Sequence, residues 1–392
     1  MIPSAPPTAA ADCILSNATL ILPDALLPGT IVLRAGRIAE IQPGRSTTAG
    51  AHDMDGDYLM PGVVDVHTDN LERQVQPRSS ARWPSRSAML THDAQCAVAG
   101  VTTVLDALCL GDLGFEKARI KTFHDGVADL TALAPTGLLK SQHFLHLRCE
   151  LPAEDMMALL DPVADNPHVR MVSLMDHSPG VGQYASLDAY RAMRRREGAS
   201  EAFIERRIVE LADLRARMRE PNRRALLARV AGLNVTLASH DDRTEEEVAE
   251  NFADGIRISE FPVTMQAAAA AHARGMKVIA GAPNIVRGGS HSGNIAAAEL
   301  VRAGTMDAFA SDYYPAALVE AAFLCAAQTG IGQTGITLPA AIALVTDHPA
   351  AMARLPDRGR LEAGLRADLV RVRVHQGQAV VRQVWRAGER VA

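Results

Sequence analysis

The 392-residue sequence lacks the features that mark several specialised classes of protein. No uncharged apolar run reaches the roughly 18 residues that a membrane-spanning helix needs, so we expect no transmembrane segment. The N-terminal stretch has no basic segment followed by an apolar core, which argues against a secretory signal peptide. Internal repeats and low-complexity tracts are also absent, which argues against a repeat architecture.

Cysteine pairs and blocks of positive charge are missing too. The five cysteines are scattered without a CxxC pair, which favours reduced thiols in a cytoplasmic protein. The 40 basic and 45 acidic residues give a formal net charge of −5, with no lysine or arginine block. We therefore expect no nucleic acid and no anionic membrane as a partner. The absence of a GxxxxGK[ST] pattern excludes a P-loop.

What the sequence does contain is an alternation of short apolar strands and helical stretches, which is typical of βαβ units. Eight candidate strands occur, at Val63–His67, Thr102–Leu108, Phe144–Cys149, Val169–Met175, Asn234–Ser239, Gly255–Ser259, Lys277–Ala280 and Ala308–Ser311. They predict an α/β fold, a (β/α)8 TIM-type barrel over residues 61–348. The charged stretch at about 187–230 exceeds one crossover helix. It predicts an inserted helical hairpin that is a structural element, a lid or a contact in a homo-oligomer.

Both ends of the chain read as short strands separated by tight turns. The expected strands are Cys13–Leu22, Thr30–Ala35, Arg37–Ile41, Asp368–Val374 and Ala379–Ala387. Each end is too small to bury a core alone, so residues 1–60 and 349–392 should combine into one small β-sandwich domain. Two disordered tails are the alternative, which fits poorly with so many β-branched residues.

Ionisable side chains follow five of the predicted barrel strands. His67 and Asp69 lie two residues apart, so a regular strand would point both the same way, with Val64 and Val66 on its opposite face. Active sites in such barrels lie at the carboxyl ends of the strands, where these side chains should converge. The resulting set of imidazoles and carboxylates comprises His67, Asp69, Glu150, His177, His240 and Asp312.

Such a set predicts a centre for one or two divalent metal ions. Each residue alone could be a buried or capping side chain, but coincidence at five strand ends favours metal binding. Glu150 would bridge two ions, and Asp312 is the candidate general base. The oxygen-rich donors suit Zn²⁺, our first candidate, and are also compatible with Mn²⁺, Fe²⁺ or Mg²⁺.

A Gly/Ser-rich segment after the seventh strand, Gly281–Asn294, predicts an anion site. Its glycines allow backbone N–H groups to approach an anion, and Arg287 adds a fork of donors. A helix expected over Ile295–Ala303 would add its positive end. A flexible loop is the alternative, but it would hardly need an arginine and a histidine. The predicted phosphate-binding residues are Arg148, Arg243, Arg287, Gly288, Gly289, Ser290, His291, Ser292 and Asn294.

Several segments resemble the amidohydrolase superfamily, among them Met60–His67, Gly100–Val104 and Gly359–Val370. The motifs HTDNLE, HLRCE, SLMDHSPG, SHDD, GAPNIVRGGSHSGN and ASDY are similar to one branch of it, the diphosphatases of phosphonate catabolism. The resemblance covers nearly the whole sequence. It implies a metal-dependent hydrolase whose substrate is a small phosphorylated sugar. That enzyme would release pyrophosphate from a 5-triphosphate and leave a 5-phosphate.

The sequence departs from the superfamily pattern in places. The second histidine of the usual HxH is Asp69, and no lysine replaces Glu150 to form the carbamate bridge of many relatives. The sixth strand ends in Glu260 without the usual histidine, and His177 follows an earlier strand than superfamily histidines usually do. Hydrolysis of a cyclic amide or N-acyl C–N bond is the alternative activity. A scaffold without chemistry is the alternative outside the enzymes.

Overall fold

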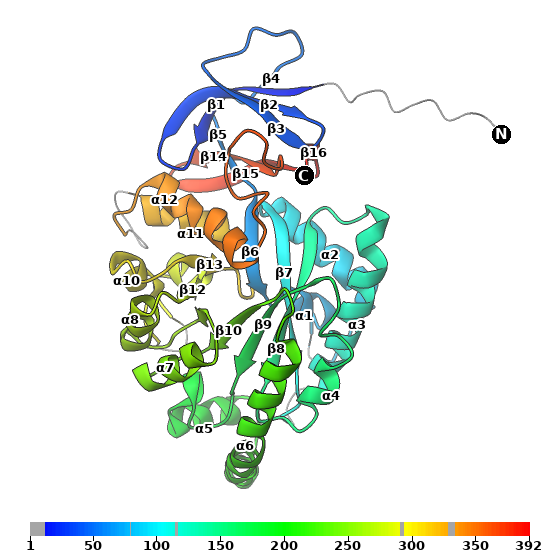
Figure 1. Cartoon of the computed structure of the whole chain (residues 1–392), viewed down its shortest axis with the longest axis vertical. Coiled ribbons are helices and arrows are strands. Elements are labelled where there is room, and N and C mark those ends of the chain that lie inside the picture. Colours follow the sequence, from blue (N-terminus) through cyan, green and yellow to red (C-terminus); the bar gives the residue numbers. More distant parts are fainter. Residues whose placement is uncertain (1–11, 79, 114–116, 291–293, 328–333) are drawn as a thin grey trace, which may run out of the picture.

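A computed structural model describes residues 12–78, 80–113, 117–290, 294–327 and 334–392. Within them, eight parallel strands form a barrel in chain order (Figure 1): β6 (Val63–Thr68), β7 (Val101–Leu110), β8 (Gln142–Glu150), β9 (Val169–Met175), β10 (Thr236–His240), β11 (Ile258–Glu260), β12 (Lys277–Gly281) and β13 (Ala308–Ala310). A parallel bridge between Thr68 and Asp312 joins the first strand to the segment after the last. The predicted (β/α)8 barrel is confirmed.

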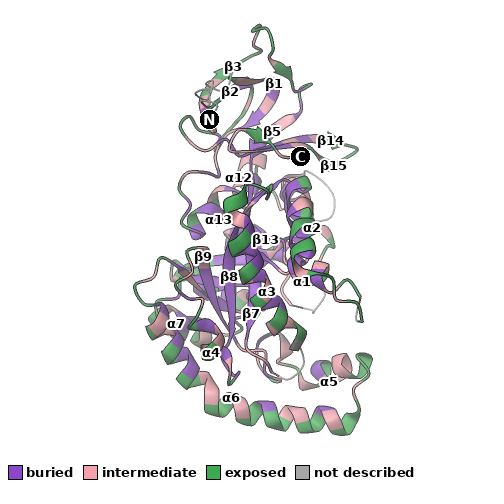
Figure 2. Ribbon diagram, turned by 90° about the vertical axis from the view of Figure 1, so that its right-hand side faces the viewer, coloured by how far each residue is buried: buried purple, intermediate pink, exposed green. Residues whose placement is uncertain are grey.

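Helices surround the barrel (Figure 2). Most pack apolar side chains on the outside of its strands, whereas α13 contributes Ala350 and Met352 to the apolar cluster inside it. They are α1 (Asn70–Val75), α2 (Ser85–Val98), α3 (Lys117–Leu133), α4 (Met156–Leu160), α7 (Glu245–Ala253), α8 (Met265–Ala273), α9 (Ala282–Val286), α10 (Ala297–Arg302), α11 (Ala317–Ala326), α12 (Leu338–Ala343) and α13 (Asp347–Met352). Among the described helices, none is long and apolar enough to cross a membrane.

The first barrel strand does not alternate as expected. Val64 and Val66 belong to the apolar cluster inside the barrel, to which every other barrel strand also contributes. The polar side chains near the rim are not part of this cluster. His67 nevertheless reaches the same interior, because the pairing register between β6 and β7 shifts between Asp65 and Thr68. The expectation that Val64 and Val66 face away from His67 was therefore wrong. An irregularity of this kind re-aims a side chain.

Strands from both ends of the chain form one mixed sheet at the end of the barrel opposite α6 (Figure 1). Its order is β16 (Glu389–Arg390), β15 (Gln378–Arg386), β14 (Leu369–His375), β5 (Tyr58–Pro61), β1 (Cys13–Ile21), β2 (Leu26–Arg34) and β3 (Arg37–Pro43), with β4 (His52–Asp53) paired to β1. Gly62 links this sheet to β6. A Cβ there would collide with Thr102 and Asp368, so the close approach requires glycine.

The charged stretch between the fourth and fifth barrel strands forms α5 (Leu187–Arg196) and the long α6 (Glu201–Val230), which crosses the rim of the barrel (Figure 2). The side chain of Asn222 donates hydrogen bonds of 2.8 Å to two backbone carbonyls after β8. Arg215 donates one of 2.6 Å to Asp176, beside His177. The insert is thus attached to the loops that carry candidate site residues.

A buried polar cluster lies between the outer face of the barrel and α2. The Asp106 carboxylate contacts His92 Nε2 at 2.6 Å and His143 Nδ1 at 2.9 Å, and His143 Nε2 lies 3.1 Å from Asp93. All four side chains are buried. Although burial disfavours the charged imidazole, the Asp106 charge and hydrogen bond raise the pKa of His143 to about 9.

Because of this cluster, the free energy of unfolding should fall in alkaline solution. Because the pKa of His143 is higher in the folded protein than its ordinary 6.5, the stabilisation is complete below about pH 6.5 and is lost as pH rises through about 9. Between pH 7 and 10 we expect a loss of about 2 to 3 kcal/mol in the free energy of unfolding. Urea unfolding of the metal-saturated protein and of His143→Asn measures it; parallel pH curves for the two would contradict the assignment.

Candidate metal centre

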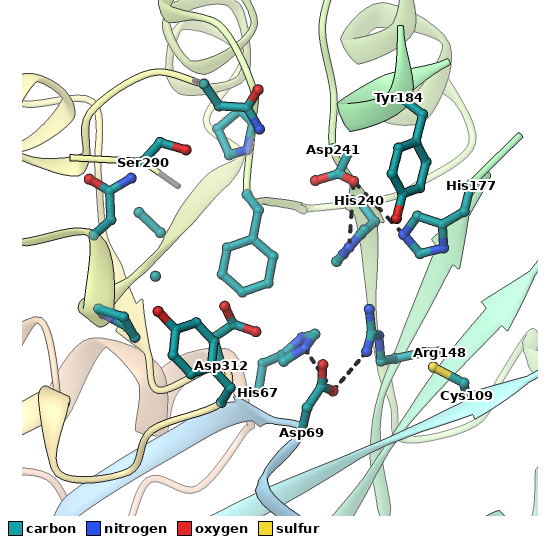
Figure 3. A pocket seen from close by; sticks show the side chains of 18 of the residues that line it. His67, Asp69, Cys109, Arg148, His177, Tyr184, His240, Asp241, Ser290 and Asp312 are labelled. Carbon is teal, nitrogen blue, oxygen red and sulfur yellow. Dashed lines mark hydrogen bonds and ion pairs between the residues drawn. The ribbon is translucent and has the colours of Figure 1, made fainter. Parts of the chain in front are cut away.

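A cavity of about 390 Å³ opens at the carboxyl ends of the barrel strands. Its floor carries the side chains that the sequence singled out at the strand ends. Figure 3 shows those of His67, Asp69, His177, His240 and Asp312 converging. The lining includes His67, Asp69, Glu150, His177, His240 and Asp312. All six predicted metal-centre residues are therefore brought together in one place.

Glu260, at the end of β11, holds two of these histidines. Its Oε1 lies 2.8 Å from His67 Nδ1, and its Oε2 lies 2.8 Å from His240 Nδ1. Glu260 is completely buried, and His67 and His240 stack with their ring centroids 6.0 Å apart. With each Nδ1 donating to the carboxylate, each Nε2 is left as an acceptor, which is how a carboxylate prepares a histidine for metal ligation.

The candidate ligand atoms form two groups, and within each group the atoms lie no more than 4.8 Å apart. One group is His67 with Asp69 and Asp312, and the other is His177 with His240 and Asp241. In the second group, Asp241 Oδ2 lies 3.9 Å from His177 Nε2 and 3.8 Å from His240 Nε2 (Figure 3). Asp241 therefore stands between the two imidazoles. In the first group, His67 Nε2 lies 3.5 Å from Asp69 Oδ1.

Glu150 has a different set of contacts from the bridging position expected for it. One carboxylate oxygen accepts the backbone N–H of His177 at 2.7 Å, and the other lies 2.7 Å from His177 Nδ1. Burial opposes ionisation of Glu150, but the His177 charge and hydrogen bonds lower its pKa. The geometry is that of a carboxylate that orients a histidine, with His177 Nε2 directed to Asp241.

Arg148 and Asp312 complete the electrostatics of the centre. Arg148 donates a 2.7 Å hydrogen bond to Asp69, and both the charge of this guanidinium and the contact with His67 hold the pKa of Asp69 low despite burial. Burial and the neighbouring negative charge of Asp69 raise the pKa of Asp312 to about 6. A carboxylate with such a pKa can accept a proton near neutral pH.

Three strand ends hold the site in strained backbone geometry. Asp241 and Phe261 directly follow β10 and β11, and Asp312 follows β13 after one intervening residue. Each has a positive φ, of 58°, 53° and 57° in that order. Side chains other than glycine rarely occupy this region. Such residues cluster at functional sites, where the surrounding structure fixes them. Here the conformation lets the backbone turn away while the Asp241 and Asp312 side chains line the cavity.

The segment after β12 forms a second wall of the cavity. Arg287, Gly289, Ser290 and Asn294 line it, as does Arg148 beside the metal-ligand candidates. Gly288 and Arg243 are not among the lining residues; Arg243 is exposed, and its backbone N–H donates to Glu247 at the start of α7. The predicted His291 and Ser292 lie outside the described residues.

The helix expected after this loop is shorter than the prediction. Instead of one helix over 295–303, the structure has α9 within the loop and the six-residue α10 from Ala297. The predicted help from a helix dipole was therefore overstated, since that field grows with aligned peptide units. Arg287 is a stronger feature, because no carboxylate in the described part of the chain pairs with it. Its guanidinium donates a hydrogen bond of 3.3 Å to the Tyr313 hydroxyl.

Sequence reasoning missed four residues of this site. Asp241 and Glu260 stand at the ends of predicted strands, and the SHDD motif contains the first of them. Their roles depend on which histidines they face, which spacing along the chain does not give. Arg119 and Arg194, which also line the cavity, come from helices far from any predicted strand end, and no sequence signal marked them.

The donor set fits a divalent metal. His67 Nε2 and Asp241 Oδ2 are buried atoms that make no hydrogen bond within the described residues, although both face the cavity among other nitrogen and oxygen donors. A buried polar atom without a partner is costly, and metal coordination would remove that cost. Imidazole with carboxylate is a common ligand set for zinc and neighbouring transition metals.

A (β/α)8 barrel with imidazoles and carboxylates at its rim is typical of TIM-barrel hydrolases that use metal ions. The fold and the site therefore indicate this class of protein. The chain belongs to the amidohydrolase family, whose model matches residues 98–392. It is 40% identical over 379 residues to the alpha-D-ribose 1-methylphosphonate 5-triphosphate diphosphatase of Escherichia coli (strain K12), covering 96% of this chain and 100% of that relative.

More distant relatives match in part or in fold alone. A D-hydantoinase of Rhizobium radiobacter is 29% identical over 117 residues, which is 30% of this chain and 24% of that protein. The structure of molinate hydrolase aligns with a TM-score of 0.66 at 12% identity, over 98% of this chain and 95% of the other. A D-hydantoinase structure aligns with a TM-score of 0.58 at 14% identity, over 97% and 95%. These two structures support the barrel architecture.

Proposed function

We propose that this protein hydrolyses alpha-D-ribose 1-methylphosphonate 5-triphosphate to the 5-phosphate and pyrophosphate, with one or two divalent metal ions. The observation that carries the proposal is the 40% identity to the Escherichia coli diphosphatase over the full length of that relative. A match over 96% of this chain supports a common activity as well as a common fold.

The bound metal would activate water and offset negative charge on the phosphate oxygens. His67, Asp69 and Asp312 would hold it on one side, and His177, His240 and Asp241 on the other. Asp312 would accept the proton of the attacking water, since its carboxylate faces the cavity and its pKa is raised to about 6. Arg148 keeps Asp69 ionised and in place.

The wall after β12 would hold the phosphate chain. Arg287 supplies a positive charge without a carboxylate partner in the described residues, and Ser290 and Asn294 supply polar groups beside it. Phosphate sites in such barrels often follow the seventh and eighth strands, which are β12 and β13 here. Donors at this wall would stabilise the charge that grows on departing pyrophosphate.

Metal removal gives the direct test. Incubation with a chelator should abolish pyrophosphate release, because the cavity's anionic carboxylates repel a triphosphate unless a metal cation balances their charge. Adding Zn²⁺, Mn²⁺, Fe²⁺ or Mg²⁺ back separately should restore it, and we expect Zn²⁺ to do so best. Pyrophosphate is measured by a coupled assay and bound metal by elemental analysis. Release that continues in metal-free protein would reject the metal-dependent mechanism.

The partial match to hydantoinases gives the competing activity a definite assay. Hydrolysis of a hydantoin or of dihydroorotate should stay at background, because the wall after β12 is built of polar groups suited to an anion. Bound metal with hydantoin turnover and without pyrophosphate would replace the proposed reaction by C–N hydrolysis.

A further inference from the structure

The cavity has another wall, opposite the one after β12, and no sequence motif pointed to it. It is formed by Leu113 after β7, Arg119 of α3, Tyr184 of a short 3-10 turn and Arg194 of α5. We call these four residues the insert wall. In Figure 3, Tyr184 lies on the side of His177 and Arg148, whereas Ser290 lies across the cavity.

A continuous series of ring contacts connects this wall to the candidate metal centre. The rings of His177 and Tyr184 meet edge to face with centroids 6.1 Å apart, and those of Tyr184 and Tyr190 at 5.6 Å. The Arg194 guanidinium then lies 5.2 Å from the Tyr190 ring centroid. Tyr190 is buried, so the series is well packed. It fixes α5 relative to His177 and sets the position of Arg194.

Both arginines are held by neighbouring acids and are only partly exposed. Arg194 donates to Glu197 at 2.8 Å with 17% of its side chain exposed. Arg119 contacts Glu72 at 2.9 Å with 29% exposed. A guanidinium carries five donors in a fixed plane, so an acid at one edge orients it towards a ligand at another. Two such groups on one wall suit an anion.

The helical insert is bonded to the loops that carry this wall and His177. Arg207 of α6 donates to the backbone carbonyl of Leu113, a residue of the wall itself. Further along α6, Arg215 is bonded to Asp176, next to His177. The helical insert is therefore bonded both to Leu113 of the wall and to the loop that carries His177. This is more specific than a solvated hairpin requires.

We propose that the insert wall binds the anionic alkylphosphonate end of the substrate, with Arg194 as its principal contact. This rests on the proposed function. The substrate has two anionic ends that diverge from the scissile α-phosphorus. The polyphosphate end carries only oxygens and suits the polar wall after β12. The phosphonate end is a monoanion with a methyl group. It needs cations beside an apolar surface, which Arg119 and Arg194 with Leu113 and Tyr184 provide.

The products separate the two ends and so test the assignment. The ribosyl phosphonate 5-phosphate and pyrophosphate should each inhibit the wild-type enzyme competitively. In Arg194→Met, the inhibition constant of the phosphonate product should rise about 10- to 100-fold, the range for losing a hydrogen bond to a charged group. That of pyrophosphate should stay within about 2-fold. Arg194→Lys, which keeps the charge without the fork, should fall between.

Turnover gives a second reading. The kcat/KM of Arg194→Met should fall about 10- to 100-fold with the phosphonate substrate but little with ribose 5-triphosphate, which lacks that group. The matched control is Arg195→Met, on the same helix but exposed, paired with Glu201 and outside the cavity lining. It should behave as wild type with both substrates.

Each contrary result has a distinct meaning. Weakened inhibition by pyrophosphate alone would overturn the assignment, because the insert wall would then hold the phosphate chain. Unchanged constants for both products, or equal losses in Arg195→Met, would overturn it as well. Wild-type protein that releases no pyrophosphate would instead reject the proposed function on which the inference rests.

Discussion

Replacing Asp241 by asparagine should lower kcat on the order of a thousandfold and reduce the bound metal. Its Oδ2 stands between the Nε2 atoms of His177 and His240, at 3.9 and 3.8 Å, and makes no hydrogen bond within the described residues. An amide is a weaker ligand than a carboxylate and brings no charge to balance the cation. A metal contributes several kcal/mol to stabilising a phosphoryl transition state, which sets the size of the loss.

The adjacent residue provides the control. Asp242 is also buried, but its carboxylate accepts hydrogen bonds from Ser239, Ser259 and Asn251 and does not line the cavity. Asp242→Asn should therefore change thermal stability more than metal content, whereas Asp241→Asn should do the reverse. Metal per protomer by elemental analysis and kcat for pyrophosphate release distinguish them. Asp241→Asn with full metal content and near-normal kcat would contradict the role of this residue.

The contrast between Asp241 and Glu150 shows where sequence reasoning stopped. The alternation of short apolar runs with helical stretches located all eight barrel strands. Parallel strands that are buried on both faces consist of nearly continuous apolar residues, which makes these runs visible in the sequence. This pattern also located the polar rim, since the ends of these strands must meet at one edge. What it could not give was the partner of each carboxylate. Glu150 and Glu260 both end a strand, yet they contact Nδ1 atoms, whereas Asp241 faces Nε2 atoms.

Two other features depend on geometry that a single sequence does not encode locally. The irregular pairing of β6 brings both the valines and His67 into the barrel, although strict alternation would separate them. The insert wall joins α3, α5 and two loops, and only the folded chain places Arg119 and Arg194 at one cavity. The family resemblance pointed to the substrate class, but the residues opposite the wall after β12 emerged only from the structure.

Glu260→Gln should weaken metal binding about 100-fold or more, although we assign Glu260 no contact with the ion. In wild type, each carboxylate oxygen accepts a hydrogen bond from one Nδ1–H, and both Nε2 atoms remain acceptors. A glutamine offers one oxygen and one NH₂. Its oxygen can still accept from one histidine, but its NH₂ must face the Nδ1 of the other. That ring then carries its proton on Nε2 and cannot bind a metal.

If His67 loses its ligating nitrogen, the group with Asp69 and Asp312 fails. If His240 loses it, the group with His177 and Asp241 fails. Glu150→Gln is the matched comparison, because Glu150 orients His177 alone. It should cost about 10- to 100-fold in metal affinity, the usual effect of losing one orienting partner. Chelator competition measures both affinities. If Glu260→Gln bound metal as tightly as wild type, the two histidines would not depend on Glu260 for ligation. The buried carboxylate would then serve the fold, and its role in preparing the ligands would be rejected.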